Sequence, residues 1–153
     1  MRGISYLTLD QANPEALMVL LNEPLIRRHL IEHEPFDHGR LMQWVSDKLM
    51  IDRTPGCKIR AVTHQGRLAG WCGIQKEQGE YEIAIVLGDA FWGLGREVFR
   101  DLMVWAGELG HHEVLIHLLE TRREYRFLRK LASVVQQTTI ADRQFTTYRL
   151  PVT

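Results

Sequence analysis

The sequence is poor in cysteine, and this excludes disulfide scaffolds and thiolate metal sites. Cys57 and Cys72 are the only cysteines among 153 residues. They lack the Cys-x-x-Cys spacing and the nearby histidine pairs of a zinc site, so we expect no metal site. We interpret both as small core or half-buried residues with free thiols.

Net charge and long hydrophobic runs are also lacking. Lys and Arg number 19, Asp and Glu number 19, and the net charge is zero with neutral histidines. This balance gives no support for nucleic-acid binding. No apolar run approaches the roughly 20 residues that a membrane helix needs, and the first residues lack the apolar core of a signal peptide. We expect a cytoplasmic protein without a membrane or nucleic-acid partner.

What is present is enough apolar sequence for a core, at 45% of the residues. We find no repeat or linker and expect one domain, residues 1–153. Hydrophobic periodicity predicts seven strands and four helices. The predicted strands are residues 5–9, 57–63, 67–74, 81–87, 114–119, 134–140 and 144–150. The predicted helices follow Asn13, Asp37, a glycine loop ending at Gly95, and Thr121.

The predicted order is strand, helix, helix, three strands, helix, strand, helix and two strands. A run of antiparallel strands thus leads into a strand–helix–strand unit. This order predicts an α+β fold of three layers with a mixed, mostly antiparallel sheet.

Several turn and cap residues support these elements. Asn13-Pro14 is typical of a helix start, and Gly110 fits the end of the third helix. Thr121 and Glu124 match a capping box, so we expect the last helix to start there. In the second hairpin strand, Gly70 and Gly73 indicate a bulge or a close backbone approach.

The most informative stretch runs from Tyr81 to the helix that ends near Leu109. An apolar strand, Tyr81 to Leu87, is followed by Gly93-Leu94-Gly95 and then by an amphipathic pattern. A glycine loop at a helix N-terminus can hold phosphate, because unpaired N–H groups and the positive end of the helix dipole meet there.

This order of elements, with the glycine loop after the fourth strand, resembles the GCN5-related N-acetyltransferases (GNAT). The family signature is Arg/Gln-x-x-Gly-x-Gly/Ala. Ala90-Phe91-Trp92-Gly93-Leu94-Gly95 matches both glycines and lacks the leading Arg or Gln. Leu21-Asn22-Glu23-Pro24, Arg27-Arg28-His29-Leu30 and Phe91-Trp92-Gly93 look like the subgroup of ribosomal-protein alanine acetyltransferases.

The resemblance implies acetyl-CoA as the cofactor. It implies that the backbone near Val86 and Leu87 pairs with the pantetheine arm. It also implies that Thr121 stands where the family has a cofactor-contacting asparagine, although a capping role explains Thr121 equally well. The pyrophosphate would be held by backbone N–H groups of the loop residues Trp92, Gly93, Leu94, Gly95 and Arg96.

Two other interpretations of the loop are weaker. An ordinary tight turn from strand to helix explains the glycines but not the full order of elements. A dinucleotide fingerprint needs a third glycine, and Val98 stands at that position.

Acetyl transfer to an amine needs a base that removes a proton from the amine. Glu82 is the candidate, because related enzymes often carry a glutamate there and apolar surroundings raise a carboxyl pKa. The family's usual acid is a tyrosine, and Leu128 stands at its position. We expect Tyr125 to lie one turn earlier on the same helix face, where it either replaces that acid or packs in the core.

The acceptor is the least determined part of the prediction. By resemblance, the segment between the first two helices lines the acceptor groove, so His29, Glu32 and His33 are candidate substrate-binding residues. A basic run, Arg122 to Lys130, is a solvated helix face or a contact for the cofactor's phosphate, another subunit or RNA. Family members often dimerise, which allows a homodimer here.

These residues favour an N-acetyltransferase that moves acetyl from acetyl-CoA to a primary amine of a small molecule or protein. The alternative is a non-catalytic module that binds an acyl-CoA. The departures from the family at Ala90 and Leu128 motivate that alternative. Transfer to an RNA-linked amine is a third reading, supported by the basic run alone.

Overall fold

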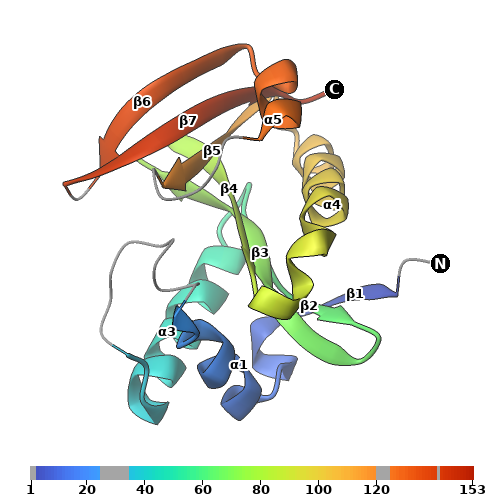
Figure 1. Cartoon of the computed structure of the whole chain (residues 1–153), viewed down its shortest axis with the longest axis vertical. Helices are drawn as coiled ribbons and strands as arrows, with labels where there is room; N and C mark the ends of the chain where they lie inside the picture. Colours follow the sequence, from blue (N-terminus) through green and yellow to red (C-terminus); the bar gives the residue numbers. More distant parts are fainter. Residues whose placement is uncertain (1–2, 25–34, 120–124, 141) are drawn as a thin grey trace.

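The computed structural model describes residues 3–24, 35–119, 125–140 and 142–153, which form a seven-stranded sheet with helices on both faces (Figure 1). The strands are β1 (Ile4–Leu7), β2 (Lys58–His64), β3 (Arg67–Glu77), β4 (Glu80–Leu87), β5 (Glu113–Leu119), β6 (Val134–Ile140) and β7 (Arg143–Pro151). The helices are α1 (Pro14–Leu21), α3 (His38–Asp52), α4 (Gly95–Glu108) and α5 (Arg126–Leu131), with 3-10 turns η1 (Leu9–Gln11) and η2 (Asp89–Leu94).

The strands lie in the order β1-β2-β3-β4-β5-β7-β6. Among these neighbours, β4 and β5 alone run parallel, and α4 is the connection between them. The predicted α+β fold with a mixed, mostly antiparallel sheet is confirmed, as is the predicted order of strands and α-helices. In the described part of the chain, no helix is long and apolar enough to cross a membrane.

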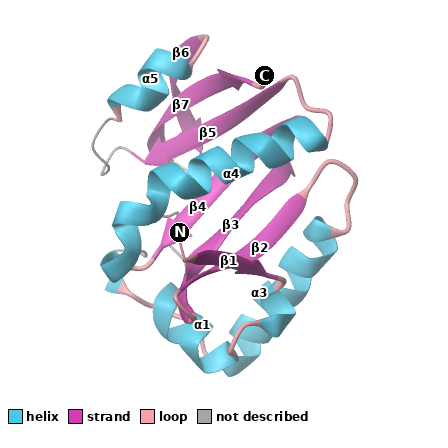
Figure 2. Cartoon of the chain, turned by 90° about the vertical axis from the view of Figure 1, so that its right-hand side faces the viewer, coloured by secondary structure: helices cyan, strands magenta, loops and turns pink. Residues whose placement is uncertain are grey.

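The two faces of the sheet carry separate cores. Val98 and Leu102 of α4 and Leu128 of α5 pack with Ile83 and Ile116 on one face. Leu17 of α1 and Leu41 of α3 pack with Trp71 and Val86 on the other. Figure 2 shows α4 crossing in front of the sheet, with α1 and α3 behind its lower part. Alternating side chains of β4 therefore reach different cores, as the period of two of a strand requires.

Several helix ends show the capping contacts that the sequence predicts. Oδ1 of Asn13 accepts from the amide of Ala16 at 3.0 Å, and Oδ1 of Asp37 accepts from that of Arg40 at 2.8 Å. Gly110 follows α4 with φ +87°, a conformation that favours glycine. The predicted caps at these positions are confirmed.

Both cysteines lie in the core, as predicted for small buried residues. Cys57 and Cys72 are both buried and free. Their thiols form no disulfide, and the described residues contain no cluster of His, Cys, Asp and Glu that could hold a metal ion.

Three predicted boundaries are wrong by two residues or more. Strand β3 continues to Glu77 rather than ending at residue 74, because it stays paired with β4 as far as Glu80. Strand β1 ends at Leu7 rather than at residue 9, because the Thr8 amide donates to Oε1 of Gln11 and turns the chain into η1. The last helix begins at Arg126, and Tyr125 is its extended N-cap (φ −106°, ψ 113°) rather than a residue on its face. Thr121 and Glu124 lie outside the described residues.

The late start of α5 has a physical reason in its aromatic residues. The ring of Tyr125 lies 6.1 Å from that of Phe127, and Phe127 lies 5.5 Å from Phe99 of α4. An aromatic pair contributes about 0.5–1.5 kcal/mol, which is comparable with the roughly 1 kcal/mol of a helix cap, so ring packing competes with the capping signal.

Candidate functional site

The parallel strands β4 and β5 are paired over a short stretch. Their register pairs are Glu82 with Leu115 and Ile83 with Ile116. Strand β4 continues to Leu87 and β5 to Leu119, and the described residues show no further pairing between them. A parallel pair that separates in this way leaves backbone beside which an extended ligand can lie.

The glycine loop lies just beyond this separation. After β4 the chain passes through η2 and enters α4 at Gly95. The N-cap residue of α4 is Leu94, which makes no side-chain hydrogen bond to the helix N-terminus. Neither Gly93 nor Gly95 has a positive φ, and a Cβ added to either meets no described heavy atom within 4 Å. Backbone conformation and packing therefore do not require these glycines. A loop without Cβ atoms at a helix N-terminus leaves room for a phosphate group beside its backbone N–H groups.

Most of the predicted cofactor-binding residues lie along this path. Val86 and Leu87 end β4 and are buried, whereas Gly93 and Arg96 are exposed. The backbone of Trp92 belongs to η2, and its side chain lies outside the described part. The remaining sequence-predicted positions outside the described residues are His29, Glu32, His33 and Thr121.

Glu82 is half-buried at the last paired positions of β4, on the face that carries α1 and α3. Its side chain is 19% exposed, and its Oε1 accepts from Nε2 of Gln75 on β3 at 3.2 Å. Burial raises the pKa of the Glu82 carboxyl, with a further increase from the charge of Glu77. The Gln75 hydrogen bond and the charge of Lys48 act against this increase. The carboxylate is therefore shifted toward the range of a base that works near neutral pH.

Lys48 of α3 supports the amide that holds Glu82. Its Nζ donates to Oε1 of Gln75 at 2.6 Å and lies 4.6 Å from the ring centre of Trp71 and 5.7 Å from that of Trp44. Burial lowers the pKa of this ammonium, although the charge of Glu82 opposes the change. The aromatic rings compensate for part of the lost hydration of the cation.

His117 of β5 is a site residue that the sequence analysis missed. Its side chain is 14% exposed, and its Nε2 lies 3.5 Å from Oε2 of Glu82. On the other side of the ring, Nδ1 lies 2.7 Å from Oγ1 of Thr147. Burial lowers the pKa of the imidazole. The available signal was one polar residue inside the apolar run from Val114 to Leu119.

These contacts form a row of polar side chains across five neighbouring strands, all on one face of the sheet. The members, in strand order, are Gln75, Glu82, His117, Thr147 and Thr138. An interior row of this kind costs desolvation unless its members are hydrogen-bonded, and each member here has a partner.

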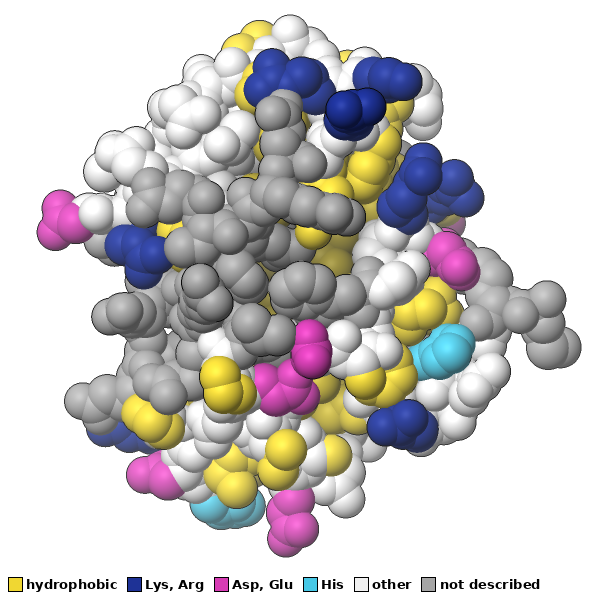
Figure 3. Space-filling model, in the orientation of Figure 1, with side chains coloured by type: hydrophobic (Ala, Val, Ile, Leu, Met, Phe, Trp, Pro, Cys, Tyr) yellow, Lys and Arg dark blue, Asp and Glu magenta, His cyan; other side chains and the backbone are white. Residues whose placement is uncertain are grey.

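Tyr125 and the basic residues lie on the α4 and α5 side of the sheet. Tyr125 is partly buried against the core on that side. The guanidinium carbon of Arg96 lies 5.0 Å from the ring centre of Phe127. Figure 3 shows Lys and Arg side chains gathered over α5, where Arg126, Arg129 and Lys130 are exposed. This arrangement gives one exposed cationic surface near the N-terminal end of α4.

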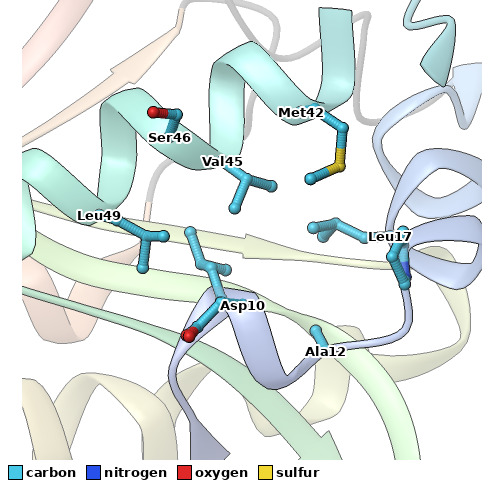
Figure 4. A pocket seen from close by; sticks show the side chains of 9 residues that line it. Asp10, Ala12, Leu17, Met42, Val45, Ser46 and Leu49 are labelled. Carbon is cyan, nitrogen blue, oxygen red and sulfur yellow. The ribbon is translucent and has the colours of Figure 1, made fainter. Parts of the chain in front are cut away.

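An apolar recess of about 190 Å³ lies elsewhere, between η1, α1 and α3 (Figure 4). Its lining includes Leu17, Met42, Val45 and Leu49, with Asp10 as its acidic residue. None of the candidate catalytic or cofactor-binding residues lines it, so it is separate from the Glu82 region.

No family model matches the sequence, and no curated protein matches it. Solved structures share the fold. An acetyl transferase from Salmonella typhimurium that modifies the N-terminal serine of a 50S ribosomal subunit protein has a TM-score of 0.79 at 14% identity, over 99% of this chain and 96% of that chain. A putative acetyltransferase from the same organism, with its cofactor acetyl-CoA, has a TM-score of 0.72 at 15% identity, over 99% and 95%.

Spermidine N-acetyltransferase from Vibrio cholerae, in complex with CoA and spermine, has a TM-score of 0.71 at 15% identity, over 97% of this chain and 94% of that chain. The chain therefore has the fold of the GNAT acetyltransferases, and the predicted resemblance is confirmed at the level of the fold.

Proposed function

We propose that this protein is an acetyl-CoA-dependent N-acetyltransferase that moves acetyl to a primary amine by direct attack. The observation that carries the proposal is the half-buried Glu82 carboxylate at the point where β4 and β5 separate. A base with a raised pKa at the point where two strands separate suits the deprotonation of an amine bound there.

The chain's own residues would hold the cofactor along one path. The backbone of Val86 and Leu87 would pair with the pantetheine arm, and N–H groups from Trp92 to Arg96 would bind the pyrophosphate. Thr121 and the exposed arginines near α4 and α5 are candidates for further contacts. Bound acetyl-CoA supplies an acetyl group activated as a thioester, and Glu82 takes the proton of the incoming amine. Tyr125 is the candidate donor of a proton to the leaving thiolate.

The acceptor is proposed as a primary amine of a small molecule or a protein. The structural neighbours include one protein that modifies a protein N-terminus and one that acts on spermidine, so both sizes of acceptor occur on this fold. His29, Glu32 and His33 are the proposed acceptor contacts. A cytoplasmic location and a homodimer complete the proposal.

Isothermal titration with acetyl-CoA tests the cofactor. We expect saturable binding, and absence of binding at millimolar ligand would contradict the proposal. Thiol release, measured against a panel of amines, tests the transfer. Glu82→Gln should lower kcat/KM by about a hundredfold or more, because it removes the base and keeps the shape. Glu108→Gln makes the same change on the exposed face of α4 and is the matched control.

A second candidate is a non-catalytic module that binds acyl-CoA. Two observations favour it: Leu128, which occupies the position of the usual tyrosine, is 2% exposed in the core, and Ala90 offers no side chain for the cofactor. Binding of acetyl-CoA without thiol release from any amine would support this candidate. Turnover that disappears in Glu82→Gln would exclude it.

A further inference from the structure

The imidazole of His117 lies between two partners of different kinds. Its Nδ1 is 2.7 Å from Oγ1 of Thr147, and its Nε2 is 3.5 Å from Oε2 of Glu82. Thr147 is 1% exposed and donates to Oγ1 of Thr138 at 2.7 Å. The two threonines come from β7 and β6, so strand pairing fixes the position of the ring.

The direction of this hydrogen-bond chain selects one tautomer of His117. Thr147 has a single hydroxyl hydrogen; when this hydrogen goes to Thr138, the Thr147 oxygen accepts from Nδ1 of His117. In the neutral ring Nδ1 then carries the hydrogen, and Nε2 presents a lone pair toward Glu82.

A carboxylate and an imidazole lone pair that face each other are both acceptors, and one proton between them satisfies both. Burial raises the pKa of Glu82 and lowers that of His117, so the two values approach each other. Two ionisable groups that interact strongly titrate as a pair, and these two side chains lie 3.5 Å apart. The separation of 3.5 Å is within the range that shortens when a substrate binds.

We propose that Glu82 and His117 form a dyad that works as a single base and holds one shared proton, with Thr147 and Thr138 as positioning residues. The proposal deepens the acetyl transfer above and rests on it. In the step itself an N–H bond of the acceptor ammonium breaks, and the proton goes between Oε2 of Glu82 and Nε2 of His117. The nitrogen keeps the electron pair and becomes the nucleophile.

Charged groups from four elements packed around the dyad act on it. Glu77 raises the pKa of both members, whereas Lys48 lowers that of Glu82. Glu80 raises the pKa of His117, and Arg149 lowers it. The pKa of each member is thus raised by at least one charge and lowered by at least one other. Burial is the largest cause of the pKa shift of both members. The four groups are Lys48 of α3, Glu77 of β3, Glu80 of β4 and Arg149 of β7.

Nitrogen NMR of the histidine side chains tests the dyad without any need for turnover. At about pH 8, above the ordinary pKa of histidine, we expect His117 to be the Nδ1–H tautomer, with its signals assigned by their loss in His117→Gln. An Nε2–H tautomer would overturn the proposal. Thr147→Val, which keeps the shape and removes the hydroxyl, should release the ring to the Nε2–H form. Thr147→Ser should keep the Nδ1–H form.

Because Thr147 is buried, a second variant protects the test from a folding failure. Thr138→Val leaves the Thr147 hydroxyl free to donate to Nδ1, so it should also move the ring hydrogen to Nε2. If His117 kept the Nδ1–H form in both Thr147→Val and Thr138→Val, or in whichever of them is soluble, the threonines would not position the ring.

Titration of His117 tests the sharing of the proton. In Glu82→Gln the midpoint of His117 protonation should fall by about one pH unit, the coupling at which two groups titrate as a pair. An unchanged midpoint would overturn the dyad. In the active protein, His117→Gln and Thr147→Val should move the acid limb of kcat/KM to lower pH, while Thr147→Ser leaves its midpoint in place.

The two proposals fail in different ways. If the Nδ1–H tautomer and the coupled titration are found but no amine is acetylated, the dyad stands and the proposed function fails. If acetylation is found but the tautomer is Nε2–H, the proposed function stands and the dyad fails.

Discussion

A Cβ atom added to Gly70 would lie 2.0 Å from the carbonyl oxygen of Val86 on the neighbouring strand. The contact is backbone to backbone, so no flexible side chain can move away. Val86 belongs to the segment of β4 that no longer pairs with β5. The same close approach that sets the position of β3 therefore also sets the position of the β4 segment that is proposed to pair with the cofactor.

Gly70→Ala is expected to destabilise the fold by about 2–3 kcal/mol, because a methyl group there forces β3 and β4 apart. Urea unfolding monitored by circular dichroism measures the change. Gly107→Ala in α4 is the matched control, since its Cβ would meet its nearest atom at 3.7 Å. The control should gain up to about 1 kcal/mol, and equal effects of the two changes would contradict the steric argument.

Gly93→Ala is expected to behave in the opposite way. Its Cβ meets no described atom within 4 Å, so the free energy of unfolding should change by less than about 1 kcal/mol. Affinity for acetyl-CoA should fall by about tenfold or more, because the methyl group would occupy space beside the loop N–H groups. A wild-type dissociation constant in calorimetry would show that the phosphate does not approach this residue.

The sequence predicted what local chemistry determines. The caps at Asn13 and Asp37 and the order of elements depend on short-range patterns, and the structure confirms them. The start of α5 was mispredicted because burial of Tyr125 and Phe127 opposes the capping signal. Nothing local to His117 identifies its partners.

The polar row could not be predicted for a reason of topology. It requires β5 to lie between β4 and β7, and β7 to lie between β5 and β6, so its members are up to 72 residues apart in sequence, from Gln75 to Thr147. Period-two alternation does place each member on a face of its strand, but it cannot tell which strands are neighbours.

Replacement of Glu82 should raise stability in a pH-dependent way. Burial raises the folded-state pKa of this acid above its unfolded value, so the charged form at high pH costs folding free energy. That cost is relieved as pH falls through the raised pKa and is gone below the unfolded value. Glu82→Gln should therefore melt above wild type at about pH 8 and close to it at about pH 4. Scanning calorimetry at both pH values measures the difference, and a variant that melts lower at high pH would contradict the assigned burial.

Lys48→Met should change the working pH of the site. The ammonium of Lys48 lowers the pKa of Glu82, so its removal should raise that pKa and move the acid limb of kcat/KM to higher pH. The pH dependence of thiol release measures this shift. Lys58→Met is the control, because Lys58 lies over Trp105 on the α4 side of the sheet. If Lys58→Met moved the acid limb of kcat/KM as far as Lys48→Met does, the shift would come from the change in net charge and not from the position of Lys48.

Glu23 connects the end of α1 with the turn that leads into the glycine loop, the proposed cofactor site. Its Oε1 accepts from the amide of Asp89 at 3.0 Å, and its Oε2 lies 3.3 Å from where a Cβ of Gly88 would be. Next to it, both polar atoms of the Asn22 amide bond the backbone of Phe36, at 2.8 and 3.0 Å.

Glu23→Ala is expected to leave the amide of Asp89 without its side-chain acceptor and to loosen the turn that precedes η2. A charge-assisted hydrogen bond of this kind contributes about 1.5–3 kcal/mol to stability. We expect a lower denaturant midpoint together with an affinity for acetyl-CoA reduced about fivefold or more, since the loop N–H groups are no longer pre-positioned. Glu15→Ala, on the exposed face of α1, is the control for both measurements. Glu23→Gln keeps an oxygen acceptor and should recover most of the affinity. If Glu23→Ala lowers stability alone and binds acetyl-CoA like wild type, the contact supports the fold but does not position the loop.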